Sequence, residues 1–488
     1  MGRPLMTMSG DRTLLDVLAA VRLDNDRPFL LHADAQVMLT YGEAARRSAQ
    51  VANALRAAGV EPGDRVAMQA EKSVDALMVY LACIRAGVVL LPMNTGYTAA
   101  EVAYLVDDAE PSLVLDDTAL AALMAVAAQQ PDSFADHPST APDLAAILYT
   151  SGTTGKPKGA MLSHRNLASN CFTLADLWGF TEADVLLHVL PIFHTHGLFV
   201  ATNCTLIAGA AMVFLPKFEP DAVLAALEHC TVMMGVPTFY TRLLADDRFD
   251  AHGCARMRLF ISGSAPLLAS THDEFRARTG QAILERYGMT ETTMLTSNPL
   301  VGERRAGTVG FALPGVEVRV VGDDDVPVAE RDAVGGIEVR GPNVFAGYWR
   351  KPELSATEFT ADGFFRTGDV GRFDADGYLH IVGRSKDLII SGGLNVYPVE
   401  VEAVLNELPG VLESAVIGLP DADFGEAVVA VVVPDGSVPI APDEVRAAAR
   451  QHLAGFKVPK QVHVVDALPR NAMGKVEKAA LRRRYATE

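Results

Sequence analysis

The segment 148–159, LYTSGTTGKPKG, is the strongest candidate for chemistry in this chain. A short apolar run enters a loop in which small residues let backbone N–H groups converge on an anion, while Thr, Ser and Lys add donors. The pattern indicates a phosphate-binding loop. It differs from a Walker A loop, because Gly152 and Gly155 are only three residues apart and Pro157 follows Lys156. By composition alone, a flexible linker is the alternative.

The elements that must position this loop alternate between helix-length and strand-length signals over the first 300 residues. Thr40 with Glu43 and Thr98 with Glu101 form capping boxes, and Ser73 begins a helix that ends near Gly87. Short apolar runs between the helices predict buried strands at 88–94, 112–115, 212–216 and 259–263. Helices that alternate with buried strands predict an α/β layered fold.

The pattern changes twice towards the C-terminus. Short strands with Gly and Pro turns predict a β-rich subdomain over about 300–385. The last hundred residues mix helical and strand signals and predict a compact α+β domain, with the polar segment 383–387 as the hinge. We therefore expect a large N-terminal domain over 1–385 and a small, mobile C-terminal domain over 386–488.

Composition excludes several classes of protein. The 488 residues are 49% hydrophobic and carry a net charge of −18, which suits a globular protein and disfavours binding to nucleic acid or anionic membranes. The five cysteines are widely spaced and suggest neither disulfides nor zinc, so a reducing cytoplasm fits best. The N-terminus lacks the apolar core of a secretory signal.

One long segment, 185–216, contains no Asp, Glu, Lys or Arg. Its length would allow a membrane span. His188, Pro191, His194 and His196 interrupt it, so we expect a buried helix and strand, and no stable membrane insertion.

Six motifs in the same order resemble the adenylate-forming acyl-CoA synthetases. They are the loop at 148–159, YGMTET at 287–292, TGD at 367–369, GRSKDLI at 383–389, SGGLNVYPVEVE at 391–402 and PRNAMGK at 469–475. The stretches LPIFHTHGLFVATNCTLIAGA, GVPTFYTRLL and ERYGMTET more narrowly resemble malonyl-CoA synthetases. The resemblance implies that a carboxylate attacks the α-phosphate of ATP to form acyl-adenylate and pyrophosphate, after which the CoA thiol displaces AMP.

The resemblance also implies how the nucleotide is bound. Glu291, with Thr150, would hold Mg²⁺. Asp369 would accept hydrogen bonds from both ribose hydroxyls, and Arg384 would also touch the ribose. Taken singly, Glu291 and Asp369 also fit an exposed helix start and an ordinary turn. The remaining ATP-binding candidates are Thr150, Ser151, Gly152, Thr153, Thr154, Gly155 and Lys156 for the phosphates, with Gly263, Ser264, Ala265, Pro266, Tyr287, Gly288, Met289 and Thr290 around the adenosine.

Lys475 is the candidate for catalysis of the first step, beside Glu291 and His194. A lysine in a C-terminal loop would stabilise charge on the α-phosphate. The alternative is one more solvated lysine in a basic tail. The resemblance implies that the C-terminal domain rotates about Lys386 between the two steps, and that Gly392 and Gly393 then line the path of the CoA pantetheine arm.

The acyl pocket is expected to be polar. His194 and His196 interrupt an apolar run, although His196 also fits a satisfied core histidine. We expect a helix starting at Thr238 to carry Arg242 in its first turns, against the macrodipole, where a second substrate carboxylate would compensate it. A salt bridge from Arg242 to Asp246 is the alternative. Further pocket candidates are Ser264, Arg286 and Met294.

These observations predict a cytoplasmic, Mg²⁺-dependent acid:CoA ligase that uses ATP, CoA and malonate, and methylmalonate if one pocket wall has room for a methyl group. The alternatives are a short- or medium-chain fatty acyl-CoA synthetase, an adenylating enzyme that loads a carrier protein, and a non-catalytic nucleotide-binding protein. The sequence leaves both a monomer and a homodimer open.

Overall fold

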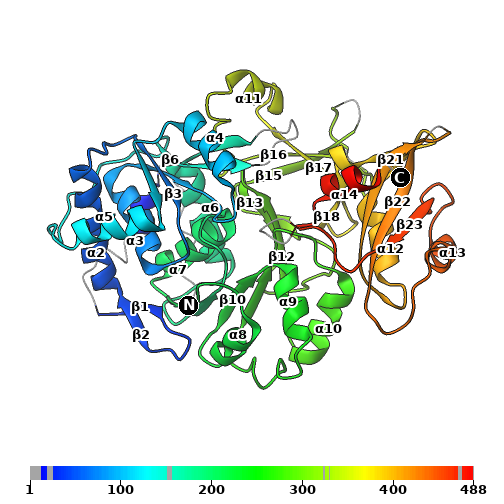
Figure 1. Ribbon diagram of the computed structural model, residues 1–488, viewed down its shortest axis with the longest axis horizontal. Helices are drawn as coiled ribbons and strands as arrows, with labels where there is room; N and C mark the ends of the chain where they lie inside the picture. Colours follow the sequence, from blue (N-terminus) through cyan, green and yellow to red (C-terminus); the bar gives the residue numbers. More distant parts are fainter. Residues whose placement is uncertain are drawn as a thin grey trace.

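Four sheets make up the fold of this computed structural model, which describes residues 12–18, 26–150, 157–322, 325–328, 330–421, 423–470 and 475–486. Three of the sheets build a large N-terminal domain, and the fourth builds a small C-terminal domain at one end of the molecule (Figure 1). The predicted division into a large α/β domain and a small C-terminal domain is confirmed.

The first sheet has the order β5-β3-β4-β6-β7, and β7 is its antiparallel edge strand. Its helices begin where the sequence predicted, because Thr40 and Thr98 form complete capping boxes and Ser73 caps the third helix. That helix ends at Gly87, which has a φ of 69°. The elements are α2 (Tyr41–Ala57), β3 (Arg65–Gln69), α3 (Val74–Ala86), β4 (Val89–Pro92), α4 (Ala99–Ala109), β5 (Leu113–Asp116), α5 (Asp117–Ala127), β6 (Leu144–Thr150) and β7 (Lys158–Ser163).

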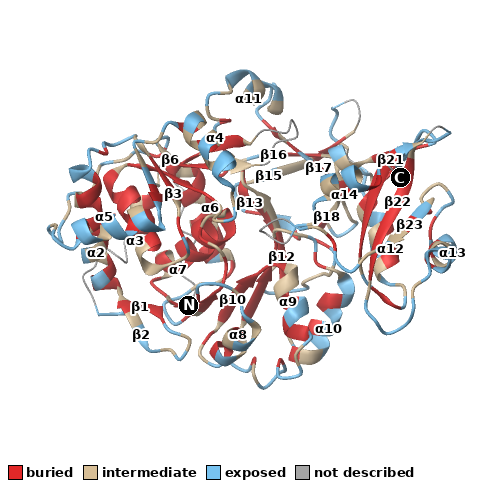
Figure 2. Ribbon diagram, viewed as in Figure 1, coloured by how far each residue is buried: buried red, intermediate tan, exposed pale blue. Residues whose placement is uncertain are grey.

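The second sheet has nine strands in the order β14-β13-β12-β11-β10-β8-β9-β1-β2. Its central strands β8 to β12 are parallel where they pair, and they are buried on both faces (Figure 2). The strands are β1 (Pro28–Leu31), β2 (Val37–Thr40), β8 (Val185–His188), β9 (Ala211–Phe214), β10 (Val232–Gly235), β11 (Leu259–Ser262), β12 (Leu284–Met289), β13 (Thr293–Ser297) and β14 (Phe311–Ala312). The helices are α1 (Leu14–Val17), α6 (His164–Leu177), α8 (Pro220–Leu227), α9 (Pro237–Leu244) and α10 (Ala269–Thr279).

The charge-free segment folds inside this domain. It forms β8, the π-helix η1 (His196–Thr202), α7 (Asn203–Ala208) and β9, and every residue of η1 is buried. This arrangement confirms the predicted buried helix and strand. Among the described residues, no helix combines the length and the apolar character that crossing a membrane requires.

An antiparallel sheet, β15-β16-β17-β18, forms the predicted β-rich subdomain. The last of its strands ends at Arg384, the short 3₁₀ helix η2 (Ser385–Asp387) follows, and the C-terminal sheet begins at Ile389. The elements are β15 (Glu317–Val321), β16 (Gly335–Arg340), α11 (Pro352–Glu358), β17 (Phe365–Phe373), β18 (Leu379–Arg384), β19 (Ile389–Ser391), β20 (Leu394–Val396), α12 (Pro398–Asn406), β21 (Val411–Asp421), β22 (Gly425–Pro434), α13 (Pro442–His452), β23 (Gln461–Val464) and α14 (Lys478–Tyr485).

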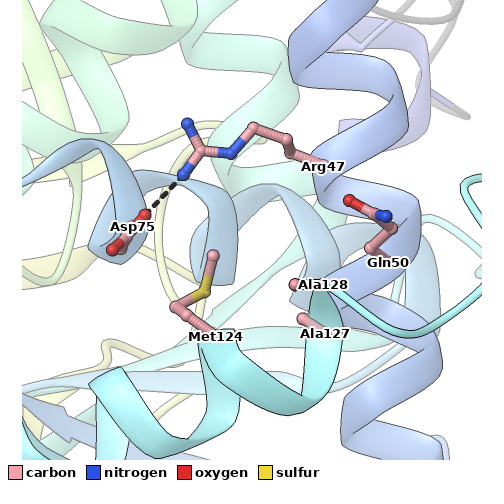
Figure 3. Close-up of a pocket in the computed structure, with 6 residues that line it drawn as sticks. All are labelled: Arg47, Gln50, Asp75, Met124, Ala127 and Ala128. Carbon is pink, nitrogen blue, oxygen red and sulfur yellow. Dashed lines mark hydrogen bonds and ion pairs between the residues drawn. The ribbon is translucent and has the colours of Figure 1, made fainter.

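A surface hollow lies among α2, α3 and α5, away from the ends of the strands that carry the candidate site residues (Figure 3). Arg47 and Asp75 form an ion pair across it at 2.5 Å, and Gln50 and Met124 complete much of its lining. Since its two charges neutralise each other and the rest of the lining is the Gln50 amide and apolar side chains, the hollow offers no chemistry that the sequence motifs require.

Candidate active site

The end of β6 and the turn between β12 and β13 bring two oxygen ligands together. The Thr150 hydroxyl donates a hydrogen bond to Glu291 Oε1 at 3.4 Å. Tyr348 donates to the same oxygen at 3.0 Å, and Lys158 lies over the Tyr348 ring at 4.7 Å. Glu291 is buried, not exposed, and burial raises the pKa of its carboxyl, although Lys158 opposes this.

This pair of oxygens fits Mg²⁺, which commonly takes one or two protein carboxylates and completes its shell with phosphate oxygens and water. The part of the chain that the structure describes contains no group of three or more His, Cys, Asp or Glu side chains that could hold a metal ion. A cation bound at Glu291 would therefore depend on oxygens of the nucleotide.

Asp369 forms the centre of a second cluster. It lies on β17 opposite Arg384 of β18, and the Arg384 Nε contacts its Oδ1 at 2.8 Å. The hydroxyl of Tyr287, from β12, donates to the other carboxylate oxygen. Burial raises the pKa of Asp369, while the charge of Arg384 opposes the rise. Three predicted nucleotide-binding residues thus meet where the nine-stranded sheet adjoins the antiparallel sheet.

Lys475 extends from the C-terminal domain towards this cluster. It is exposed, but protein atoms crowd its ammonium and the charges of Arg384 and Arg286 repel it. These effects lower its pKa to about 8, whereas Asp369 and Glu291 act in the opposite direction. The charge of Lys475 also lowers the pKa of His194. The ammonium therefore lies within electrostatic reach of residues from both clusters and of the predicted acyl pocket.

The turn after β11 faces the histidines of the charge-free segment. Ser264 has a φ of 71°, unusual for a residue with a side chain, and its hydroxyl lies 3.4 Å from His196 Nδ1. His196 Nε2 is buried and has no hydrogen-bond partner among the described residues. Its backbone N–H donates to His194 Nδ1 at 3.3 Å. His196 is thus only half satisfied, which favours the polar-pocket interpretation over a satisfied core histidine.

Arg286, on β12, is a buried cation without a carboxylate partner among the described residues. Its side chain is 3% exposed, and its Nε and Nη2 have no hydrogen-bond partners there. Burial lowers its pKa to about 9, and its charge lowers the pKa of both His194 and His196. Arg286, His194 and His196 therefore lie close together, and they form a cationic, incompletely hydrogen-bonded site.

Arg242 does not occupy the environment that the sequence predicted. Its helix begins at Pro237, one residue earlier than expected, and has only eight residues, so Arg242 lies in the last turn. A cation there agrees with the macrodipole instead of opposing it. Arg242 is exposed, and Asp246 pairs with Arg248 instead. The argument from an uncompensated buried cation was therefore wrong for Arg242 and applies to Arg286.

Several predicted residues have other surroundings. Met294 is buried in the main hydrophobic core. Gly392 and Gly393 form the turn between β19 and β20 with φ values of 60° and 78°, where glycine is favoured, and Lys386 lies in η2. Gly263, Gly288 and Met289 lie on or beside β11 and β12, as do Ala265, Pro266 and Thr290. Ser151, Gly152, Thr153, Thr154, Gly155 and Lys156 fall outside the described residues.

Two residues around Glu291 were missed by sequence reasoning. Lys158 is the second lysine of the GKPKG segment, and a cation two residues from Lys156 was a usable signal. Tyr348 follows a glycine and forms an isolated β-bridge with Ala160, and nothing local indicated that it would reach Glu291 across the fold.

Comparison with known proteins identifies the family. Residues 18–349 match the family described as AMP-binding enzyme, and residues 400–475 match the AMP-binding enzyme C-terminal domain. The chain belongs to the AMP-binding enzyme family. It is accordingly an ATP-dependent CoA ligase of the adenylate-forming type, with ATP, CoA and a small carboxylate as substrates.

Two curated relatives show the range of this AMP-binding enzyme's similarities. It is 40% identical over 465 residues to feruloyl-CoA synthase from Amycolatopsis sp, covering 92% of this chain and 94% of the relative. It is 36% identical over 504 residues to malonate–CoA ligase ACSF3, mitochondrial, from Mus musculus, covering 91% and 86%. The family is therefore certain from sequence, while the relatives act on different acids.

Among solved structures, ATP-bound MatB from Rhodopseudomonas palustris matches this AMP-binding enzyme with a TM-score of 0.92 and 52% identity, over 96% of this chain and 99% of that chain. The apo structure of the same MatB gives a TM-score of 0.82 with the same identity and coverage. The arrangement described above is thus more similar to that of the ATP-bound protein.

Proposed function

We propose that this enzyme forms malonyl-CoA from malonate, ATP and CoA, releasing AMP and pyrophosphate. The observation that supports the proposal is the buried guanidinium of Arg286, whose Nε and Nη2 have no partners among the described residues. Malonate has one carboxylate for adenylation and a second that Arg286 would bind through charge-assisted hydrogen bonds. The similarity to malonate–CoA ligases and to MatB agrees with this substrate.

The same cation disfavours monocarboxylates. Acetate would leave Arg286 buried and unpaired, and removing one partner of a buried ion pair costs about 3–5 kcal/mol. Since each 1.4 kcal/mol corresponds to a factor of ten, this cost corresponds to discrimination of about 10² to 4 × 10³. Methylmalonate and sulfoacetate, the latter named for a relative 35% identical to this chain, also carry a second anionic group and are the competing substrates.

For the first half-reaction, we propose roles that follow the two clusters. Glu291 and Thr150 would hold Mg²⁺, which when bound neutralises phosphate charge. Asp369 would orient the ribose through its carboxylate, while Tyr287 and Arg384 fix that carboxylate in place. Lys475 would donate hydrogen bonds to the α-phosphate oxygens as the substrate carboxylate adds, and its electrostatic contact with Asp369 supports this position.

For the second half-reaction, we propose that the C-terminal domain turns about Lys386 and brings the Gly392–Gly393 turn to the pantetheine path. Two observations support a separate first arrangement: the greater similarity to ATP-bound MatB than to apo MatB, and the nearness of Lys475 to the nucleotide cluster. If the C-terminal domain turns, it carries Lys475 away from the nucleotide cluster, so Lys475 would act in adenylation and not in thioester formation.

The test is mass spectrometry of products after incubation with Mg·ATP, CoA and equal concentrations of malonate, methylmalonate, sulfoacetate, acetate, butyrate, octanoate and ferulate. Malonyl-CoA and AMP as the main products are expected. A fatty or aromatic acyl-CoA would discard the proposed substrate but keep the ligase. Arg286→Met and Arg242→Met, assayed in parallel, compare the two arginines: the proposal expects Arg286→Met to abolish the preference for malonate and Arg242→Met to leave most of it.

A further inference from the structure

Lys72 is partly buried and makes an unusual contact with the buried His188, between the two large sheets. It lies between β3 and α3, and its Nζ lies 2.8 Å from both the Nδ1 and the carbonyl oxygen of His188, the last residue of β8. The ring of Phe214 lies 4.4 Å from the same ammonium. Among the described residues, no carboxylate forms an ion pair with Lys72. A partly buried cation that is held by a buried histidine and an aromatic ring, with no carboxylate beside it, needs another explanation than charge neutralisation.

The hydrogen bonds around His188 select one tautomer. A lysine ammonium can only donate, so His188 Nδ1 must accept from Lys72 and its Nε2 must carry the proton. That Nε2 lies 3.0 Å from the carbonyl oxygen of Gly197 and donates to it. The Thr202 hydroxyl donates to the same oxygen at 3.0 Å. Lys72 and the Gly197 carbonyl thus favour the same His188 tautomer, and Lys72 supports the hydrogen bond that His188 donates to that carbonyl.

Gly197 lies in the first turn of η1, where a π-helical hydrogen-bonding pattern replaces the α-helical one. Short π-helical segments are uncommon and often occur at functional sites. A Cβ atom at position 197 would overlap the Pro191 carbonyl, so the backbone here packs against the preceding turn. The neighbouring residue, His196, points one ring nitrogen at Ser264 and leaves the other without a partner beside Arg286. The position of His196 therefore depends on the same turn that His188 holds.

We propose that Lys72 is a positioning residue for acid selection: through the Nε2–H of His188 and the Gly197 carbonyl, it fixes the first turn of η1 and so holds His196 in the acyl pocket. This inference rests on the proposed pocket of Arg286, His194 and His196. Neither Lys72 nor His188 touches the substrate in this proposal. If Lys72 only joined the two sheets, its loss would lower the stability of the protein but would not change the KM for the acid selectively.

The test measures ATP–pyrophosphate exchange at varied acid and varied ATP. Lys72→Met keeps most of the apolar stem and removes the donor. We expect its KM for malonate to rise about tenfold or more, because small displacements of a positioning group are costly, with KM for ATP changed less than about twofold. Lys217→Met, at an exposed lysine paired with Glu219, is the control and should leave both constants unchanged.

A double-mutant cycle with His196→Ala decides between positioning and general stability. If Lys72 acts through His196, then Lys72→Met in the His196→Ala background should raise the acid KM less than about twofold further. An undiminished effect in that background, or an equal rise of the ATP and acid KM values, overturns the proposal. Thr202→Val, which removes the other donor to Gly197, should cause the same selective rise and replaces Lys72→Met if that variant does not fold.

The substrate proposal and this inference can fail separately. The acid that the wild-type enzyme activates best is determined first, and the cycle is measured with that acid. A preference for a different acid contradicts the malonate proposal, whereas loss of coupling between Lys72 and His196 with the preferred acid contradicts the positioning role.

Discussion

The guanidinium of Arg286 packs directly on the backbone of Gly263. A Cβ atom at position 263 would lie 2.7 Å from the Arg286 Nε and closer still to other guanidinium atoms. Adjacent strands produce this contact, because β11 ends at Ser262 and pairs in parallel with β12, which carries Arg286. The absence of a side chain at Gly263 therefore makes room for the buried cation.

Gly263→Ala should displace Arg286 without removing its charge. We expect the KM for malonate to rise on the order of tenfold or more, since about 1 Å of displacement at a binding group has effects of this size. Gly336→Ala is the matched control, because a Cβ there meets no atom nearer than 3.5 Å. Unchanged malonate kinetics in Gly263→Ala would contradict the assignment of Arg286 to the acyl pocket.

Lys475→Ala should separate the two half-reactions. Loss of one donor to a developing charge typically costs 10²–10³ in rate, so adenylation measured by pyrophosphate exchange should fall by about that factor. Thioester formation from preformed malonyl-adenylate should retain most of its rate. Lys478→Ala, three residues away and paired with Glu402, is the control. Equal losses in both steps would rule out a role confined to adenylation.

The pKa of Lys475, lowered to about 8, predicts a basic limb in the pH profile. The ammonium is present below this pKa and is lost above it, so the single-turnover rate of adenylation should decline as pH rises through about 8. Lys475→Arg keeps a positive charge throughout this range and should lose that limb, whatever its absolute rate. Persistence of the same limb in Lys475→Arg would assign it to another group.

Glu291→Gln should weaken Mg²⁺ binding, because the substitution removes the carboxylate charge and keeps the shape of the side chain. Its amide oxygen can still accept from Tyr348 and Thr150, so folding should be little affected. We expect the Mg²⁺ concentration for half-maximal adenylation to rise on the order of tenfold, because Mg²⁺ prefers carboxylate oxygen. Glu353→Gln, an exposed glutamate of α11, serves as the control. An unchanged Mg²⁺ dependence would refute the role of Glu291.

Lys386→Pro should hold the C-terminal domain in the described arrangement. The helical backbone of η2 is compatible with the fixed φ of proline, whereas a rotation at this position is not. Adenylation should remain within about threefold of wild type, while thioester formation should fall by about tenfold or more. If CoA transfer is undiminished, the domain does not turn about Lys386.

Local signals were enough to predict much of the fold. The capping pairs Thr40–Glu43 and Thr98–Glu101 define helix starts through contacts within four residues. The strands could be predicted because a short run of apolar residues indicates a buried strand. The motif order likewise placed Asp369 and Glu291 among the nucleotide residues. The fold predictions succeeded because their information lies in short segments, whereas the nucleotide-binding roles of Asp369 and Glu291 stay predictions from a resemblance that spans the chain.

The acyl pocket depends on contacts that no local pattern contains. Arg242 was expected in the first turns of a helix, where a cation opposes the macrodipole. Because α9 has only eight residues, Arg242 lies in its last turn, where a cation is favourable. Arg286 shares a strand face with the buried Leu284, two residues earlier, which was the available hint. Its burial is completed by β11 and β13, which come together only in the folded sheet.

The contact between Lys72 and His188 has a consequence for how such enzymes can be recombined. The two residues belong to different sheets and are separated by 116 positions in the chain. In a chimera of two such enzymes, a crossover anywhere between the two positions would combine the loop after β3 of one enzyme with β8 of the other. Hybrids that exchange acid preference should therefore inherit both positions from the same parent, or acquire a compatible pair anew.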